Sequence, residues 1–260
     1  MKLSVLTENC AGTIFGAEHG LSYLIEVDGK KLLFDTGHSD LYLKNAKLLD
    51  LDLNSEVDTI ILSHGHWDHG DGLQHIEGKT LVTHPAAFKK RYRKMDRSYV
   101  GLNFTLSQAK HKFTLVSTKD PYYITPSVLF LGEIPRTNDF ESKNSAFIDQ
   151  DGQVDDVPDD SGLAIIQDKS LIIISGCAHS GICNMTEYAS SITGINKIAA
   201  VIGGFHLKHQ SKELTKTIQY LKEKRVSQIY PSHCTELPAL AAFFESFRIK
   251  QLKSGMVLEF

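Results

Sequence analysis

One stretch, Ile60–Leu73 (IILSHGHWDHGDGL), constrains the fold of this chain more than any other. A strand-like apolar run leads directly into three histidines and an aspartate, which are His64, His66, Asp68 and His69. Side chains alternate along an extended strand end, so His64 and His66 point to the same side and can hold one metal ion. Asp68 and His69 lie a turn further on and can face a second ion. Because imidazole nitrogen and carboxylate oxygen are ligands of borderline divalent metals, the stretch predicts half of a metal site.

Later strands also end in turns that carry a histidine. His179 follows LIIISGCA, His206 follows AAVIGGF, and His233 follows SQIYPS. Strands of one α/β layer share an end, so their C-terminal turns can converge on one crevice. We therefore expect His179 and His233 to complete the metal site, and His206 to act there as a ligand, an acid/base group or a substrate contact. With two ions roughly 3.5–4 Å apart, a bridging water would become a nucleophile near neutral pH.

Asp35 ends another apolar run, in LFDTG. A carboxylate at this position can accept a hydrogen bond from the free ring N–H of a metal histidine and so fix its tautomer. It can equally cap the turn that follows, and the sequence leaves both interpretations open.

The order of the patterns favours a mixed α/β fold. Strand-like runs at Lys2–Thr7, Leu21–Val27 and Lys31–Gly37 surround a hairpin signal at Asp28, and strand–helix alternation fills the last hundred residues. The segment 84–160 is less regular, and we interpret it as an insertion with a mobile substrate loop. A length of 260 residues with 42% hydrophobic content otherwise predicts a single domain over 1–260.

Composition argues against several partners and locations. The formal net charge of −3 gives no electrostatic reason to expect nucleic acid or an anionic membrane as partner. One basic run, Lys89–Lys94, is either a solvated face or a feature that attracts an anionic small-molecule substrate. No signal peptide and no apolar run of roughly 18 residues is found, and the four cysteines show no C-x-x-C spacing. We expect a cytoplasmic protein without disulfides; the sequence does not indicate its oligomeric state.

The motif His64-Gly65-His66-Trp67-Asp68-His69, the DTG turn at Asp35 and the later strand-end histidines together resemble the metallo-β-lactamase superfamily. The resemblance covers nearly the whole chain. It implies a four-layer αββα sandwich with two mixed β-sheets and a site for two divalent ions at one edge. Zinc is the first expectation for these ions, with manganese or iron as alternatives.

A narrower resemblance rests on EHGLSYLIE, LFDTGHS, LSHGHWDHGDGL, GEIPR, SGCAHSGI and GGFHL. These segments are similar to the branch named after 7,8-dihydropterin-6-methyl-4-(β-D-ribofuranosyl)aminobenzene-5'-phosphate synthase, whose bacterial members are mostly described as metal-dependent hydrolases. One turn departs from the wider superfamily, which usually has Gly-Asp where this chain has Gly176-Cys177-Ala178-His179. Either Cys177 takes the bridging position as a metal ligand, or His179 substitutes for a separate histidine ligand. A thiolate ligand would favour zinc.

The leading functional prediction is a dinuclear metal-dependent hydrolase that uses a metal-activated hydroxide on an ester, lactone or phosphoester. The alternatives are a synthase-like transferase, in which an arylamine displaces a leaving group at a methylene, and a metal-binding module without hydrolytic activity. An oxidoreductase of the diiron flavoprotein type is disfavoured, since those relatives carry a carboxylate where His66 stands. Candidate catalytic or substrate-binding residues, besides His206, are His19, Glu133, Arg136 and Glu141.

Overall fold

The computed structural model describes residues 1–260 and divides into two compact units, each of which is described by itself. The first unit contains Met1–Lys119, Ala146–Asp155 and Leu252–Phe260, and the second contains Asp120–Ser145 and Asp156–Gln251. The assignment of 1–260 to one domain stays a prediction.

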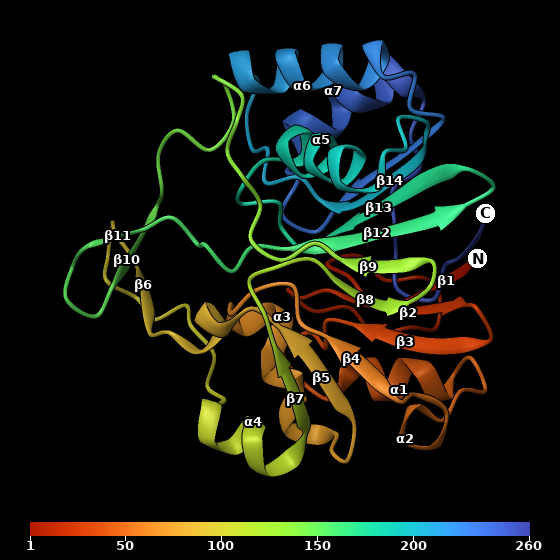
Figure 1. Cartoon of the computed structure of the whole chain (residues 1–260), viewed down its shortest axis with the longest axis vertical. Coiled ribbons are helices and arrows are strands. Elements are labelled where there is room, and N and C mark those ends of the chain that lie inside the picture. Colours follow the sequence, from red (N-terminus) through yellow and green to blue (C-terminus); the bar gives the residue numbers. More distant parts are fainter. The chain divides into compact units, whose positions relative to one another are not determined.

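A seven-stranded mixed sheet forms the centre of the first unit (Figure 1). Its order is β16 (Val257–Glu259), β1 (Lys2–Thr7), β2 (Ser22–Val27), β3 (Lys30–Phe34), β4 (Thr59–Ile61), β5 (Thr80–Thr83) and β7 (Thr114–Ser117). The strands from β16 to β3 are antiparallel, and β3, β4, β5 and β7 are parallel. The predicted hairpin joins β2 to β3, with Asp28 and Gly29 both at positive φ, as a tight two-residue turn requires.

The helices of the first unit cover one face of this sheet. They are α1 (Leu41–Lys47), α2 (Leu53–Glu56), α3 (Trp67–Gly70) and α4 (Leu106–Lys112), with 3₁₀ turns at η1 (Asp71–His75) and η2 (Pro85–Phe88). Leu24, Leu33 and Ile60 of the sheet belong to one buried apolar cluster with Tyr42 and Ala46 of α1. Alternate residues of a strand point to opposite faces of the sheet. Burial of one face therefore fixes the register of the strands, since a shift by one residue would expose their apolar side chains.

The segment 84–160 is more ordered than the sequence suggests. It supplies β7 to the first sheet and β8 and β9 to the sheet of the second unit. Only part of it, β6 (Arg91–Arg93), β10 (Phe147–Asp149) and β11 (Val154–Asp155), forms a separate three-stranded antiparallel sheet. The strands within it are only two to four residues long and therefore show no clear hydrophobic periodicity in the sequence. Whether the segment contacts substrate stays a prediction.

The second unit is built around a six-stranded mixed sheet. Its order is β15 (Gln228–Ser232), β14 (Ile198–Gly204), β13 (Ser170–Ser175), β12 (Gly162–Gln167), β9 (Val128–Phe130) and β8 (Tyr122–Thr125). The helices α5 (Ile182–Thr193), α6 (Lys212–Glu223) and α7 (Leu237–Phe247) cover one face of it (Figure 1). Parallel pairing joins β13, β14 and β15, so these strands end at one edge of the sheet.

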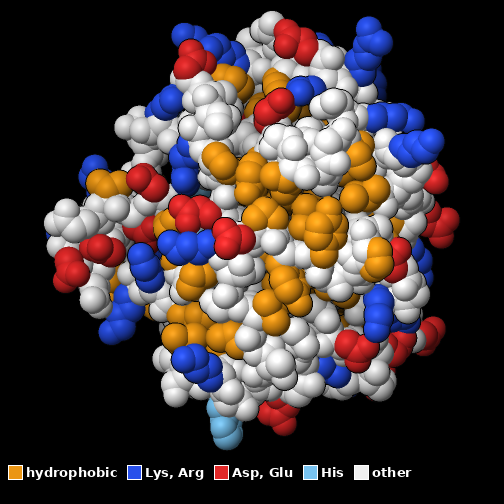
Figure 2. All heavy atoms as spheres, viewed as in Figure 1, with side chains coloured by type: hydrophobic (Ala, Val, Ile, Leu, Met, Phe, Trp, Pro, Cys, Tyr) orange, Lys and Arg blue, Asp and Glu red, His pale blue; other side chains and the backbone are white.

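Charges on the surface are mixed. On the face drawn in Figure 2, acidic and basic side chains are interspersed rather than gathered by sign, in keeping with the small net charge. None of the helices combines the length and the hydropathy that a membrane span needs. The cytoplasmic location stays a prediction, whereas the predicted mixed α/β class with two mixed sheets is confirmed.

Candidate metal centre

The histidine-rich motif begins just past the end of β4 and runs into α3. Its first spacer, Gly65, lies against the backbone of η2: a Cβ there would come within 1.7 Å of the carbonyl oxygen of Ala87. Only glycine allows this approach, and it holds the loop between His64 and His66 in place. His66 then forms the N-terminal boundary of α3 in an extended conformation.

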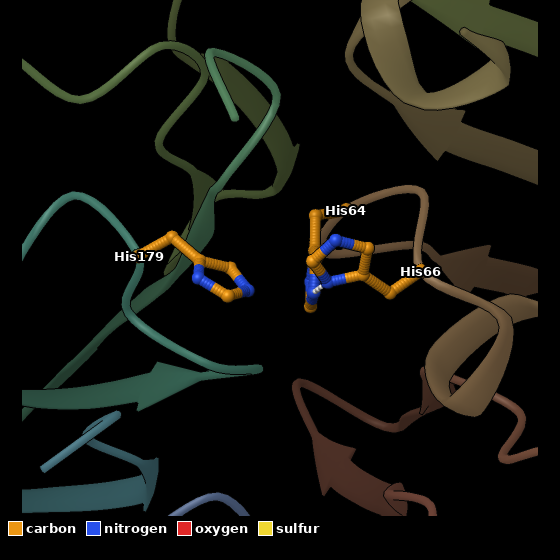
Figure 3. A group of neighbouring side chains, drawn as sticks. All are labelled: His64, His66 and His179. Carbon is orange, nitrogen blue, oxygen red and sulfur yellow. Dashed lines mark hydrogen bonds between the residues drawn. The ribbon is translucent and has the colours of Figure 1, made fainter. Parts of the chain in front are cut away.

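His64 and His66 turn their rings toward each other (Figure 3). Nε2 of His64 lies 2.9 Å from Nδ1 of His66, and the ring planes are nearly perpendicular at 81°. Burial holds the pKa of His64 well below its usual value of 6.5, so this imidazole is neutral at pH 7. A neutral ring nitrogen is the form that binds a metal ion.

Asp68 and His69 form a second pair on α3. Oδ2 of Asp68 lies 3.9 Å from Nε2 of His69, and both residues are buried. Oδ2 of Asp68 is also 3.2 Å from Nε2 of His19, whose side chain is half exposed. The first unit thus brings His19, a predicted substrate-binding residue, next to a predicted ligand.

Asp35 lies at the centre of a buried hydrogen-bond network. Its Oδ2 lies 2.7 Å from Nδ1 of His69 and accepts from the hydroxyl of Ser63 at 2.7 Å, while Oδ1 accepts from the Ser63 backbone N–H at 2.7 Å. Burial raises the pKa of Asp35, and the neighbouring His69 and Ser63 act in the opposite direction. The contact expected between Asp35 and a histidine ring is present; that His69 binds a metal stays a prediction.

Ser63 extends the influence of Asp35 to His64. Its hydroxyl oxygen lies 2.9 Å from Nδ1 of His64. Since the hydroxyl proton goes to the Asp35 carboxylate, the hydroxyl oxygen is left to accept from Nδ1–H of His64. One carboxylate therefore sets two tautomers and leaves Nε2 of both His64 and His69 as lone-pair donors. The sequence did not single out Ser63, because a serine before a histidine carries no signal without this contact.

Replacing Ser63 with alanine should weaken metal binding by about 10-fold, since His64 would lose the acceptor that fixes its tautomer. Isothermal titration of the metal-free protein with Zn²⁺ measures this. The matched control is Ser107→Ala, an exposed serine of α4 in the same unit. Equal affinity in wild type and Ser63→Ala would show that the hydroxyl has no part in orienting the ligand.

The second unit carries the remaining predicted ligands on the turns after its parallel strands. His179, which is also labelled in Figure 3, follows β13, and its ring lies 4.4 Å from that of His206, which follows β14. His233 follows β15 and is 7% exposed. The ligand atoms of His233, Cys177 and Cys234 lie within 4.8 Å of one another. Each turn contains a left-handed residue, with φ of 48° at Ala178 and 52° at both His206 and His233.

The loop after β9 organises the second unit rather than presenting free charges. Glu141 is 2% exposed and accepts from the backbone N–H groups of Cys183 and Asn184, both at 2.8 Å, at the N-terminus of α5. This carboxylate is a helix cap, so the substrate contact considered for it is wrong. Arg136 is exposed and donates to the backbone carbonyl of Asp156, and Glu133 is exposed. A substrate role for Arg136 and Glu133 stays a prediction.

The donor set fits divalent metal ions. In the first unit, ring nitrogens of His64 and His66 face each other. A carboxylate oxygen of Asp68 lies near Nε2 of His69, whose Nδ1 contacts Asp35. In the second unit an imidazole accompanies two thiols. Nitrogen, oxygen and sulfur donors of this kind suit zinc, and the nitrogen and oxygen donors also accept manganese and iron.

Comparison with known proteins gives a consistent picture. The sequence profile of the metallo-beta-lactamase superfamily matches residues 15–187. The whole chain is 38% identical to 97% of the 7,8-dihydropterin-6-methyl-4-(beta-D-ribofuranosyl)-aminobenzene-5'-phosphate synthase of Methanocaldococcus jannaschii. It is also 34% identical to an uncharacterized protein of that organism, over 92% of each chain.

Among solved structures, Tm1679, described as a metal-dependent hydrolase of the beta-lactamase superfamily, matches with a TM-score of 0.88 and 29% identity. The match covers 100% of this chain and 99% of that one. The fold and the residue patterns read from the sequence therefore agree with both comparisons. This chain belongs to the metallo-β-lactamase superfamily.

Proposed function

We propose that this protein is a metal-dependent hydrolase that binds two divalent ions and acts on an ester, lactone or phosphoester. Its proposed ligands are the six residues predicted from the sequence: His64, His66, Asp68, His69, His179 and His233. The observation that carries the proposal is the arrangement in the first unit of two buried pairs, His64 with His66 and Asp68 with His69, in which Ser63 holds the ring of His64 and Asp35 holds the ring of His69.

Divalent ions, when bound, would supply Lewis acidity and a water-derived nucleophile near neutral pH. The residues of the chain do the rest. Asp35 holds His69 directly, and His64 through Ser63, in one tautomer, so neither ring has to move a proton between its nitrogens before it binds. We assign His206 the role of exchanging a proton or contacting the substrate, and the position of its ring beside that of His179 supports this. The sequence contains no G-x-S-x-G nucleophile motif that would offer a separate route.

Removal of metal should abolish turnover. The protein is purified without added metal, and its metal content is measured by elemental analysis alongside hydrolysis of chromogenic phosphodiester, phosphomonoester and lactone substrates. Dialysis against a chelator should then remove activity on the preferred substrate, and Zn²⁺ or Mn²⁺ should restore it. Full turnover by protein that holds less than about a tenth of a metal per chain would contradict the proposal.

A second candidate is a transferase that resembles the synthase of M. jannaschii, and the 38% identity over the whole chain favours it. The product name joins a 7,8-dihydropterin-6-methyl group to an aminobenzene nitrogen. The two candidates separate in one assay. The protein is given 4-(β-D-ribofuranosyl)aminobenzene 5'-phosphate and a 7,8-dihydropterin with an activated 6-methyl group, and the coupled product is sought by mass spectrometry. Coupling without hydrolysis of the chromogenic panel would replace the hydrolase proposal with the transferase.

A further inference from the structure

Cys177 and Cys234 of the second unit lie close together past the end of β14, although they follow strands on opposite sides of it. Cys177 follows β13 and Cys234 follows β15, with β14 between these strands. Neighbouring strands are about 4.8 Å apart, so β13 and β15 are separated by roughly 10 Å. The two sulfur atoms nevertheless lie within 4.8 Å of each other, and Sγ of Cys234 is 3.6 Å from the carbonyl oxygen of Cys177. The two turns therefore bend toward each other over the end of β14.

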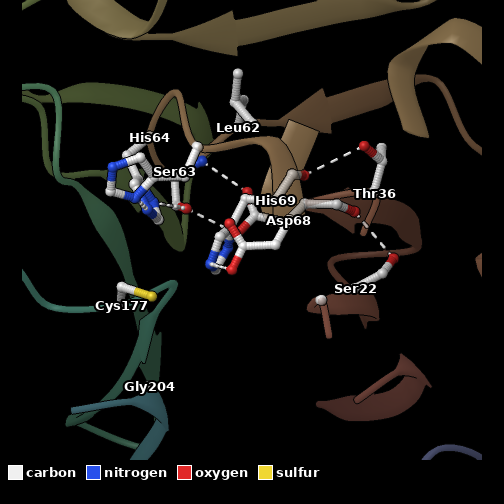
Figure 4. Close-up of polar contacts among 12 residues, drawn as sticks. Ser22, Thr36, Leu62, Ser63, His64, Asp68, His69, Cys177 and Gly204 are labelled. Carbon is white, nitrogen blue, oxygen red and sulfur yellow. Dashed lines mark hydrogen bonds and ion pairs between the residues drawn. The ribbon is translucent and has the colours of Figure 1, made fainter. Parts of the chain in front are cut away.

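Gly204, at the end of β14, makes this approach possible. A Cβ at this position would lie 2.5 Å from Sγ of Cys234 and 3.2 Å from Cα of Cys177. Figure 4 shows Cys177 beside the chain at Gly204. The left-handed residues Ala178 and His233 turn the chain next to each cysteine. The absence of a side chain at Gly204 thus lets the Cys234 sulfur pack next to the backbone of Cys177, within 4.8 Å of the Cys177 sulfur.

The remaining cysteines differ from this pair. Cys183 is 2% exposed within α5, and burial raises the pKa of its thiol, which makes it a poor nucleophile. Cys10 belongs to the first unit. Within the pair, Cys234 is partly exposed and Cys177 is 4% exposed. An oxidant can therefore reach Cys234 first, and Cys177 is the thiol within reach of the product.

We propose that Cys177 and Cys234 are a redox-active pair that forms a reversible disulfide when the protein meets a peroxide. The peroxide oxidises the Cys234 thiol to a sulfenic acid, and one water is released. The Cys177 sulfur then attacks the Cys234 sulfur, the S–O bond breaks, and the hydroxyl leaves as a second water. Two thiols lose two hydrogens and two electrons in total, and the peroxide takes up both. A dithiol reductant reverses the reaction by thiol–disulfide exchange.

Oxidation should also reduce metal binding, and this consequence rests on the proposed function. Cys177 lies two residues before the proposed ligand His179, and Cys234 directly follows the proposed ligand His233. A disulfide pulls the two turns together and so shifts the proposed ligands His179 and His233, which these turns carry. The oxidised protein should therefore hold less metal than the reduced protein.

The test uses the full chain, reduced and freed of metal, and treated with a small excess of hydrogen peroxide. Intact mass should fall by about 2 Da, and digestion without reductant should give a peptide pair cross-linked through Cys177 and Cys234. Dithiothreitol should restore the original mass. Cys177→Ser and Cys234→Ser should each abolish the cross-link, whereas Cys10→Ser should behave as wild type. Failure to form the cross-link, or its formation between other cysteines, would overturn the proposal.

Reduced and oxidised protein are then each incubated with Zn²⁺ and cleared of excess metal, and their metal content separates this proposal from the hydrolase proposal. A cross-link in protein that binds no metal in either state supports the redox pair and counts against the metal centre. Metal in the reduced protein without any cross-link supports the metal centre and counts against the redox pair. A cross-link accompanied by loss of metal supports both.

Discussion

His66→Ala is expected to abolish metal-dependent turnover while the protein stays folded. His66 supplies one of two ring nitrogens that face each other at 2.9 Å, so its loss removes half of that pair. Loss of a residue that only supports a ligand costs about 10–100-fold, and loss of the ligand itself should cost more. Activity is measured as turnover of the preferred chromogenic substrate. Metal binding is measured as metal content, and folding is measured by the circular dichroism melting curve.

The matched control for this variant is His111→Ala, which removes an exposed histidine of α4 from the same unit. It should keep wild-type metal content and turnover. The assignment of His66 would be wrong if the variant retained both metal and activity, since no ligand can be deleted without consequence. A variant that lost metal together with its melting transition would be uninformative, so His66→Gln, which retains a polar side chain of similar reach, is made in parallel.

Asp35→Asn is expected to weaken metal binding by roughly 10–100-fold and to lower thermal stability. The amide has nearly the same shape as the carboxylate but only one acceptor oxygen. It cannot accept from the Ser63 backbone, the Ser63 hydroxyl and His69 together, and it leaves a buried donor without an acceptor. An unsatisfied buried group costs about 1–3 kcal/mol, which would lower the melting temperature by several degrees. Zn²⁺ titration and thermal melts with and without metal measure both effects.

Asp58→Asn controls for the change of charge, because Asp58 is exposed just before β4. That variant should match wild type in both measurements. If Asp35→Asn lowered stability but left metal affinity unchanged, Asp35 would be a structural residue and its role in orienting His69 would be wrong. If affinity fell for both variants alike, the effect would come from long-range charge alone.

The sequence was sufficient for the architecture wherever patterns were long or turns were distinctive. The hairpin at Asp28 and Gly29 was predicted, since tight turns have local signals. The short strands β7, β8 and β9 were not, because three or four residues contain too little periodicity. Their place in the sheets is decided by pairing with distant strands.

The sequence indicated the ligand-type residues of the candidate site but not the hydrogen bonds that join them to their neighbours. The ligand-type residues of Ile60–Leu73 stand out because polar residues rarely follow a buried strand so densely. The role of Ser63 was missed, since it depends on a contact with a residue 28 positions away. Glu141 was misinterpreted for a similar reason, as its partners at the start of α5 lie 42 and 43 positions further along. Contacts of this range are set by tertiary packing and leave no local pattern.

Two left-handed residues that follow strands, His206 and His233, lower the stability of the fold and also carry side chains of the proposed site. His206 and His233 both have a φ of 52°, a region that costs a residue other than glycine about 1–3 kcal/mol. Glycine or asparagine would relieve that strain but would remove the imidazole. A mutant library selected only for thermal resistance should therefore enrich glycine and asparagine at these two positions, and under the proposed function the survivors should be inactive. Selection for activity should instead retain the strained histidines and find its stability elsewhere in the chain.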